Sequence, residues 1–309
     1  MESLMVYDSV ILGAGPAGIT AAVYLVRKGL KVLVVSVDVG GQTLISGSIE
    51  NYTGFSFVTG ADLSLKFREH MKLSGAYLRE FERAEKIVRE DELFVVKTEK
   101  DEYKAKTVVV ATGKRSRELG VKGENKFKNK GITYCVTCDG PLFKNKEVCV
   151  VGGGNSALEG IIELRRLASK VYVVNSGSEF TGDKVLIDKV YGFDNVRIYH
   201  DAAIDEVYGS EYLEGIKIRH NNESVDIKVK GLFVEIGLVP NSGFLDIVKK
   251  NEFNEIVVDK HNGTDIAGIF AAGDVTDVPE KQIIVACGEG AKAALSVFKY
   301  LFSNNKLSY

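Results

Sequence analysis

The sequence has no excess of either charge, because 40 lysine and arginine residues are nearly matched by 42 aspartate and glutamate residues, for a formal net charge of −2. An even balance removes the broad positive field that attracts nucleic acid or anionic membrane surfaces. The sequence also lacks an apolar run near the ~20 residues that a membrane span needs, and no basic and apolar leader precedes the first apolar strand. We therefore expect a cytoplasmic protein with no nucleic-acid or membrane partner.

Cysteine is scarce, at 4 residues in 309, and this number is too small for a fold built on disulfides. Two of the four, Cys149 and Cys287, stand alone in apolar stretches and are expected in the core. Cys135 and Cys138 form a Cys-x-x-Cys pair. In a chain without a secretion signal, that spacing favours a redox role over a structural bridge.

Proline is also scarce, at 4 residues, whereas 32 glycines punctuate runs of β-branched residues. These apolar runs and the glycines between them form a strand–turn–helix–strand pattern that occurs twice in the sequence. Each copy is typical of a βαβ unit with parallel strands. The first is expected at Val6–Leu12, Pro16–Lys28 and Lys31–Ser36, and the second at Glu147–Val151, Ser156–Ala168 and Lys170–Val174. The repeat predicts an α/β fold of two Rossmann-like dinucleotide-binding domains, each with a central parallel sheet and a β-meander.

The remaining apolar segments complete these domains. Phe94–Thr98 and Tyr103–Ala111 are expected in the first meander. Short antiparallel strands are expected at Val196–Tyr199, Ala203–Tyr208, Leu213–Arg219 and Ser224–Lys228. A buried strand at Gly231–Gly237 then leads to Ile269–Ala272 and to a long amphipathic helix at Ile283–Phe302, both placed back on the first domain. The second domain, at 115–241, is therefore predicted to be inserted into a discontinuous first domain at 1–114 and 242–309.

Both βαβ units carry a glycine-rich turn between strand and helix. In the first turn, Gly13 permits the tight bend, Gly15 lets the backbone approach a pyrophosphate, and Gly18 lets helix and strand pack closely. Backbone N–H groups at the helix start then face the anion. The second turn, Gly152 to Ser156, repeats the arrangement with Ala157 in place of the third glycine. Two such turns usually indicate two nucleotides, although a relict second turn remains an alternative.

The second unit lacks the residues that usually select a nicotinamide nucleotide. Its second strand ends at Asn175, where an acid would accept the ribose 2′-OH of NAD or an arginine would pair with the 2′-phosphate of NADP. An asparagine can make one neutral hydrogen bond there, worth roughly 0.5–1.5 kcal/mol. NADH use is therefore conceivable, and tight selection of NADPH is not expected.

The cysteine pair is the chemical centre of the sequence. Two cysteines separated by two residues can close a small disulfide, and nearby backbone amides lower the pKa of one thiol. Asp139 directly follows Cys138 and is a candidate proton shuttle. A zinc site would need two more paired ligands, and neither the other cysteines nor the four histidines provide them. No metal site is therefore expected.

At this point the sequence resembles the low-molecular-weight thioredoxin reductases and the catalytic part of the flavoprotein subunit of alkyl hydroperoxide reductase. The resemblance covers nearly the whole chain. The matching pieces are Gly13–Gly18, Gly40–Gln42, Glu50–Tyr52, Ala111–Gly113, Cys135–Gly140, Gly152–Ala157, Ala271–Asp274 and Lys281–Ile283.

The resemblance implies an FAD-dependent disulfide oxidoreductase that is usually a homodimer. In the family the residue matching Cys138 faces the flavin, the residue matching Cys135 attacks the partner disulfide, and Asp139 matches the acid/base. One domain also rotates against the other, which would need linkers near 114–118 and 239–242. The implied FAD residues are Gly13, Gly15, Pro16, Ala17, Gly18, Gly41, Gln42, Asn51, Thr112, Gly113, Gly273, Asp274, Gln282 and Ile283. The implied nicotinamide residues are Gly152, Gly154, Asn155 and Ser156.

The departures from the family leave the electron donor open. NADPH-dependent thioredoxin reductases carry a His-Arg-Arg stretch and a further arginine where this chain has Asn175–Gly177 and Thr181, and the hydroperoxide reductases carry an acid at Asn175. The first hypothesis is a reductase driven by NADH or NADPH that reduces thioredoxin or a thioredoxin-like protein. The second takes electrons from ferredoxin, and the third is a flavin-binding sensor without turnover. Because the first strand begins almost at Met1, we expect a stand-alone enzyme without a thioredoxin-like extension.

Overall fold

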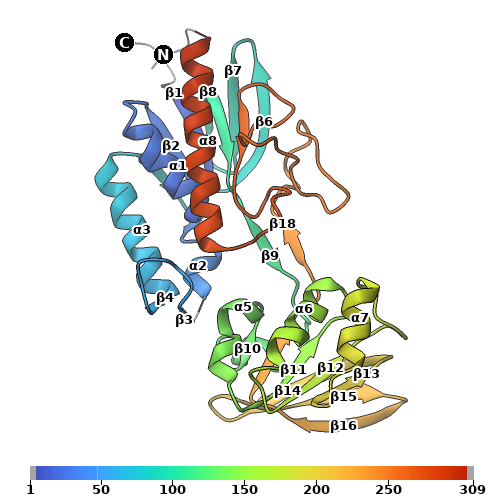
Figure 1. The fold of residues 1–309 in the computed structure, drawn as a ribbon. Coiled ribbons are helices and arrows are strands. Elements are labelled where there is room, and N and C mark those ends of the chain that lie inside the picture. The colour runs from blue at the N-terminus through green and yellow to red at the C-terminus, as the bar shows by residue number, and fades with distance from the viewer. Residues whose placement is uncertain (1–4, 47, 305–309) are drawn as a thin grey trace. The chain divides into compact units, whose positions relative to one another are not determined.

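The computed structural model describes residues 5–46 and 48–304, and the chain forms two compact units (Figure 1). The first unit comprises the described parts of 1–46, 52–115 and 239–309. The second comprises 116–238 together with the short segment 48–51. The chain passes from one unit to the other through β9 (Lys114–Ser116) and β18 (Leu238–Pro240), which pair with each other.

The first unit is built on a seven-stranded sheet in the order β5-β2-β1-β8-β7-β6, with β19 beside β8. The pairs among β1, β2, β5, β8 and β19 are parallel, whereas β6, β7 and β8 pair in antiparallel fashion as a meander. The strands are β1 (Val6–Ala14), β2 (Val32–Val39), β5 (Tyr77–Glu80), β6 (Ala84–Glu90), β7 (Leu93–Thr98), β8 (Glu102–Val110) and β19 (Ile269–Ala271). Val10, Ile11 and Leu12 of β1 are all buried, as expected for a strand that is covered on both faces.

Helices pack on this sheet and form the core of the first unit. These are α1 (Pro16–Val26), α2 (Gln42–Ile45), α3 (Gly60–Ser74) and α8 (Ile283–Ser303), and the short strand β4 (Val58–Thr59) directly precedes α3. The short strand β3 (Ser48–Ile49) lies in the segment that groups with the second unit. Gly290 of α8 lies so close to α1 that a Cβ atom there would overlap the carbonyl oxygen of Ala17. This contact fixes α8 directly against the start of α1.

The second unit contains a five-stranded parallel sheet in the order β10-β17-β11-β12-β13, and a three-stranded antiparallel sheet, β14-β15-β16. The parallel strands are β10 (Ile132–Thr133), β11 (Glu147–Val151), β12 (Lys170–Val174), β13 (Val196–Tyr199) and β17 (Gly231–Val234). The antiparallel strands are β14 (Ala202–Gly209), β15 (Leu213–His220) and β16 (Glu223–Lys228). The helices are α4 (Glu124–Phe127), α5 (Val136–Asp139), the 3₁₀ turn η1 (Gly140–Phe143), α6 (Asn155–Leu164) and α7 (Lys184–Tyr191).

The structure confirms both βαβ units and corrects one strand. Val196–Tyr199 was expected to be antiparallel, but β13 pairs with β12 in parallel, with Val196 opposite Val171. The reason is α7, a helix that the sequence analysis did not identify. A helical crossover between β12 and β13 returns the chain in the same direction and extends the parallel sheet.

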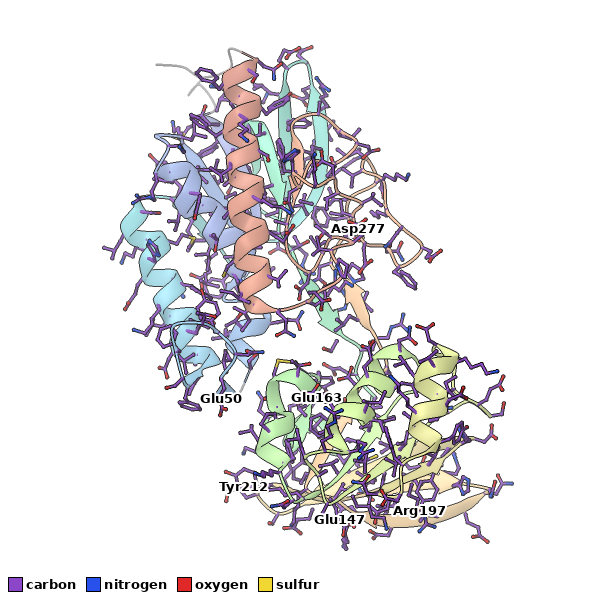
Figure 2. All side chains as sticks on the ribbon, in the orientation of Figure 1. Glu50, Glu147, Glu163, Arg197, Tyr212 and Asp277 are labelled. Atoms are coloured by element: carbon purple, nitrogen blue, oxygen red, sulfur yellow. A yellow bond between two sulfur atoms is a disulfide. The ribbon has the colours of Figure 1, made fainter. Side chains whose placement is uncertain are left out.

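Charged side chains such as those of Glu147 and Arg197 lie at the outside of the second unit (Figure 2). Within residues 5–46 and 48–304, every helix is too short or too polar to cross a membrane.

Candidate active site

The first glycine-rich turn has the close backbone approaches that a phosphate-binding turn requires. Gly13 has a φ of 103°, and a Cβ atom on it would overlap the carbonyl oxygen of Ala111. A Cβ on Gly18 would likewise overlap the carbonyl oxygen of Gly13. A Cβ on Gly15, in contrast, would meet nothing within 4 Å. The turn is therefore packed tightly on its protein side and open at Gly15, where an anion can approach the N-terminus of α1.

Other segments predicted to bind FAD gather around this turn. Gly41 has a φ of 55°, and its Cβ position lies 3.5 Å from the Cα of Gly15. Gly273 approaches the turn from the opposite end of the chain, because its Cβ position lies 2.9 Å from the Cβ of Ala17. The side-chain amide of Gln42 donates to the backbone carbonyl of Lys114 at 2.6 Å.

A largely buried group of charges belongs to the same unit. Lys114 pairs with Glu255, which is also 3.4 Å from the Nζ of Lys281. Burial raises the pKa of the Asp274 carboxyl, while Lys281 and Lys114 act in the opposite direction. Burial and the neighbouring Lys114 also lower the pKa of Lys281. Glu255 therefore links Lys114, which follows Gly113, to Lys281, which precedes Gln282. Both lysines also act on the carboxyl of Asp274.

The remaining predicted FAD residues occupy defined positions. Thr112 donates its hydroxyl hydrogen to the carbonyl of Asn241 at 2.8 Å, and Gly113 has a φ of 66°. Gln282 occupies the N-cap position of α8, and Ile283 is the first residue of that helix. Asn51 follows β3 in the segment that groups with the second unit, whereas the other predicted FAD residues belong to the first unit.

Asp38 was missed by the sequence analysis. It lies at the end of β2, is exposed, and accepts the N–H of Gly41 at 2.9 Å. An acid about 20 residues beyond the glycine-rich turn is the usual ribose-binding residue of a dinucleotide fold. That spacing from Gly18 was a usable signal. The open Gly15, the close glycine contacts and this acid together fit a dinucleotide such as FAD.

The second turn repeats the backbone geometry of the first. Gly152 has a φ of 140°, and a Cβ atom on it would overlap the carbonyl oxygen of Glu235, just as Gly13 approaches Ala111. Asn155 donates to the carboxylate of Asp183 at 3.2 Å and accepts the Asp183 N–H at 2.7 Å. Gly154 precedes α6 as its N-terminal cap residue, and Ser156 is exposed.

The sequence suggested that the Asn175 side chain could bind a ribose hydroxyl, but in the structure this side chain is engaged within the protein. It is buried, and its amide nitrogen lies 3.1 Å from the carbonyl oxygen of Gly177, 2.8 Å from that of Glu179 and 3.0 Å from Nδ1 of His200. The side-chain amide therefore holds its own loop together. The absence of an acid or an arginine at this position could be read from the sequence, whereas these internal bonds could not.

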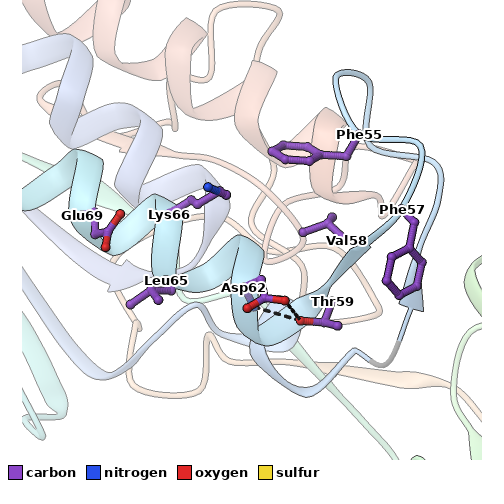
Figure 3. A pocket seen from close by; sticks show the side chains of 8 residues that line it. All are labelled: Phe55, Phe57, Val58, Thr59, Asp62, Leu65, Lys66 and Glu69. Carbon is purple, nitrogen blue, oxygen red and sulfur yellow. Dashed lines mark hydrogen bonds between the residues drawn. The ribbon is translucent and has the colours of Figure 1, made fainter.

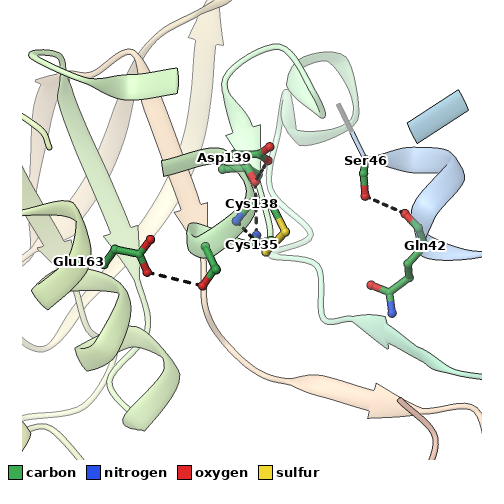
Figure 4. Close-up of a disulfide and its surroundings, with 8 residues drawn as sticks. Gln42, Ser46, Cys135, Cys138, Asp139 and Glu163 are labelled. Atoms are coloured by element: carbon green, nitrogen blue, oxygen red, sulfur yellow. Dashed lines mark hydrogen bonds between the residues drawn. A yellow bond between two sulfur atoms is a disulfide. The ribbon is translucent and has the colours of Figure 1, made fainter. Parts of the chain in front are cut away.

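Cys135 and Cys138 form a disulfide at the start of α5, drawn in yellow in Figure 4. Cys135 caps α5, and its Sγ accepts the backbone N–H of Cys138 at 3.2 Å. Both cysteines are partly exposed. The other two are reduced, and burial raises the pKa of the Cys149 thiol far above its usual range. Only the predicted pair therefore combines a disulfide with access to a reaction partner.

Asp139 completes the cluster around the disulfide (Figure 4). Thr133, in β10, donates its hydroxyl hydrogen to the Asp139 carboxylate. Burial raises the pKa of Asp139, and the bond from Thr133 partly opposes the rise. A carboxyl group with a raised pKa holds a proton more readily near neutral pH, as an acid/base for thiol chemistry must. Nothing in the sequence identified Thr133 as its partner.

The first unit also has one surface concavity. It is lined by residues of 55–69, among them Phe55, Val58 and Leu65, and by Thr59, whose hydroxyl accepts the backbone N–H of Asp62 at the start of α3 (Figure 3). It contains none of the predicted site residues. Within the described residues there is also no cluster of three His, Cys, Asp or Glu side chains that could hold a metal ion.

Two nucleotide-binding folds and one Cys-x-x-Cys disulfide define an oxidoreductase that couples a nucleotide cofactor to disulfide chemistry. The chain belongs to the pyridine nucleotide-disulphide oxidoreductase family, which matches residues 7–290. The predictions of a two-domain Rossmann-type α/β fold and of an FAD-dependent oxidoreductase are confirmed.

Individual relatives agree with this assignment. A thioredoxin reductase from Streptococcus pyogenes is 35% identical, with a TM-score of 0.92 over 97% of this chain and 100% of that one. A protein named NADH dehydrogenase from Bacillus subtilis is 41% identical over 96% of this chain and 59% of its own length. The F component of the alkyl hydroperoxide reductase of Staphylococcus aureus is 41% identical over 96% and 60%, respectively. The chain thus spans about three fifths of these two relatives.

Proposed function

We propose that this protein is a thioredoxin reductase type flavoenzyme that passes electrons through FAD to the Cys135–Cys138 disulfide and on to a thioredoxin or thioredoxin-like protein. The observation that carries the proposal is the disulfide beside the largely buried Asp139, in a chain with two nucleotide-binding turns. Likeness to a thioredoxin reductase over the whole of that structure supports it.

The FAD would be held by the first turn, by Gly41 and Gln42, and by the segments around Gly113, Asp274 and Gln282. Thr112, Gly273, Ile283 and Asn51 are kept in this set on the family resemblance, and Asp38 would accept a ribose hydroxyl. When bound, FAD supplies two-electron transfer between a hydride donor and a disulfide. The Lys114 segment would be held in place beside the site by its ion pair with Glu255 and by the bond from Gln42 to its carbonyl.

The cysteine pair would carry out the disulfide exchange. Reduction of the Cys135–Cys138 bond takes up two electrons and two protons and leaves two thiols. Cys135 then attacks the partner disulfide as a thiolate, and Cys138 attacks the resulting mixed disulfide, so that the pair is oxidised again and the partner leaves as a dithiol. Asp139 would give a proton to the departing sulfur and take one from the attacking thiol.

The proposed donor is NADH or NADPH with weak selectivity, bound by Gly152, Gly154, Asn155 and Ser156. The absence of an arginine at Asn175 supports weak selection of NADPH, and the name of the Bacillus subtilis relative supports NADH. An anaerobic titration of the purified protein, read at the flavin absorbance, tests this proposal. We expect either nucleotide to bleach the flavin at micromolar to millimolar levels. An unchanged spectrum with both would exclude a nicotinamide donor.

A ferredoxin donor is the second candidate, and it rests on Asn175. Because its amide is bonded within its own loop, the second turn has no side chain at that position dedicated to a nicotinamide ribose. If ferredoxin is the donor, reduced ferredoxin should support thioredoxin reduction while both nicotinamides leave the flavin oxidised. Failure of reduced ferredoxin in the same assay would eliminate this candidate.

A homodimer and a cytoplasmic location are also proposed, on the family resemblance. Sedimentation analysis of the purified protein checks the first, and cell fractionation checks the second.

A further inference from the structure

Glu124 is a buried acid of the second unit that the mechanism above does not use. It is the first residue of the short helix α4, and its fractional exposure is only 3%. One carboxylate oxygen accepts the backbone N–H of Leu119 at 2.9 Å, and the other accepts that of Gly120 at 2.7 Å. The first oxygen also accepts the hydroxyl hydrogen of Tyr134 at 2.9 Å. A carboxylate removed from water needs such donors, and here they come from two separate segments of the chain.

Tyr134, which donates to this acid, is the residue directly before Cys135. Its side chain is partly buried and packs against the hydrophobic core of the second unit, which includes Phe127 and Ile132. Burial, and after it the bond to the Glu124 carboxylate, raises the pKa of the Tyr134 hydroxyl. The hydroxyl therefore keeps its proton and remains a donor. Both the ring and the hydroxyl of Tyr134 are thus fixed one peptide bond away from the disulfide.

The redox motif is held at both of its ends. At the end that follows Cys138, the carboxylate of Asp139 accepts the hydroxyl hydrogen of Thr133. The same hydroxyl oxygen accepts the backbone N–H of Cys135 at 3.3 Å. At the other end, the bond from Tyr134 to Glu124 anchors the chain just before Cys135, whose extended backbone leads into α5. The backbone of Cys135 is therefore fixed by bonds on both sides of the pair.

We propose that Tyr134 and Glu124 are positioning residues for the redox pair, which hold Cys135 at the separation from Cys138 that a disulfide requires. The proposal deepens the function proposed above and rests on it. The Cα atoms of the two cysteines are 5.3 Å apart, within the usual range for a disulfide. Two thiols held at this separation have a higher effective concentration than two thiols on a loose segment. The anchor therefore favours the disulfide, and it makes the reduced pair a stronger reductant toward its partner.

The test compares the wild type with Tyr134→Phe, which keeps the ring and removes only the hydroxyl. Each holoenzyme is equilibrated without oxygen in mixtures of reduced and oxidised dithiothreitol. Reduction of the pair takes two electrons and two protons from one dithiothreitol, which closes its own disulfide. Alkylation after an acid quench, read by mass spectrometry, gives the fraction of Cys135 and Cys138 present as thiols. We expect the equilibrium constant for closing the disulfide to fall about fivefold in the variant, which is a rise of about 20 mV in the reduction potential.

Tyr172→Phe is the matched control, because the Tyr172 hydroxyl also donates to a glutamate of the second unit, Glu147, at 3.1 Å and at the surface. It should keep the wild-type equilibrium. Glu124→Gln weakens the acceptor of the same bond and should shift the equilibrium in the same direction as Tyr134→Phe, so it decides the question if that variant does not fold.

Urea unfolding of each protein separates positioning from a purely structural role, which would lower the stability and leave the redox equilibrium unchanged. An unchanged equilibrium in Tyr134→Phe, or in Glu124→Gln if only that variant folds, would overturn the proposal. An equally large shift in Tyr172→Phe would also overturn it. The assay needs neither a nicotinamide nor thioredoxin, so flavin bleaching and thioredoxin turnover test the proposed function separately.

Discussion

At the scale of single residues, burial determines the chemistry of Asp139. The carboxylate is largely removed from water, and it accepts a hydrogen bond from the hydroxyl of Thr133. Loss of solvation disfavours the charged form, so the pKa of Asp139 rises, and the Thr133 hydroxyl retains part of the stabilisation of the anion. The result is a carboxyl group that can both hold and release a proton beside two cysteines.

Replacing Asp139 by Asn should remove the proton transfer and keep the fold, because the amide oxygen can still accept the Thr133 hydroxyl. We expect disulfide reduction to slow by about 10²–10⁴-fold. In the wild type, any step that needs protonated Asp139 should slow as the pH rises through its raised pKa, and in the variant this dependence should be lost. Stopped-flow kinetics of thioredoxin reduction from pH 5 to pH 9 measure both effects. A variant with the wild-type rate and pH profile would show that Asp139 is not the acid/base.

At the scale of elements, the first nucleotide turn depends on the contact between α1 and α8. Gly290 lies against the carbonyl of Ala17, and Gly273 lies against the side chain of the same residue. Both glycines permit a helix or a loop to approach the turn more closely than a side chain would allow. The position of α1, and with it the position of Gly15, is thus set by residues from the opposite end of the chain.

Gly290→Ala should force α8 away from α1, because the new methyl group overlaps backbone that has no free space. We expect a loss of roughly 1–3 kcal/mol in stability, together with weaker retention of FAD. Gly288→Ala is a matched control in the same helix, since its Cβ position meets nothing within 4 Å. It should gain up to about 1 kcal/mol from helix propensity. Urea unfolding and flavin release on dilution measure these effects, and equal behaviour of the two variants would contradict the role given to Gly290.

At the scale of the whole molecule, the chain divides its chemistry between two units. The first contains most of the predicted FAD residues, and the second contains the cysteine pair with Asp139. Electron entry and disulfide exchange should therefore be separable by mutation.

Cys135→Ser and Cys138→Ser should each keep bound flavin and its reduction by the donor, because neither residue belongs to the nucleotide-binding turns. Both should lose disulfide reduction by at least about 10³-fold, since the two cysteines act as one group. Cys287→Ser changes a cysteine outside the pair and should keep the activity. Flavin absorbance and thioredoxin turnover distinguish the two steps. Persistent turnover in both pair variants would place the exchange chemistry elsewhere.

The sequence could predict features that local physics determines. Gly13 and Gly152 follow apolar strands and precede helices, so both βαβ units could be located from the pattern alone. The spacing of Cys135 and Cys138 indicated a disulfide in the same way. The direction of β13 could not be predicted without α7, and Asp38 was overlooked although its distance from Gly18 pointed to it.

By itself, the sequence determined the two dinucleotide folds, their glycine-rich turns and the identity of the disulfide-bonded cysteines, because these depend on neighbours within about 20 residues. Only the tertiary structure decided which distant groups meet them. It brought the carbonyl of Ala111 to Gly13, the carbonyl of Glu235 to Gly152, and Gly290 to Ala17. Such pairings depend on how strands and helices pack, and packing brings together residues whose separation along the chain carries no pattern.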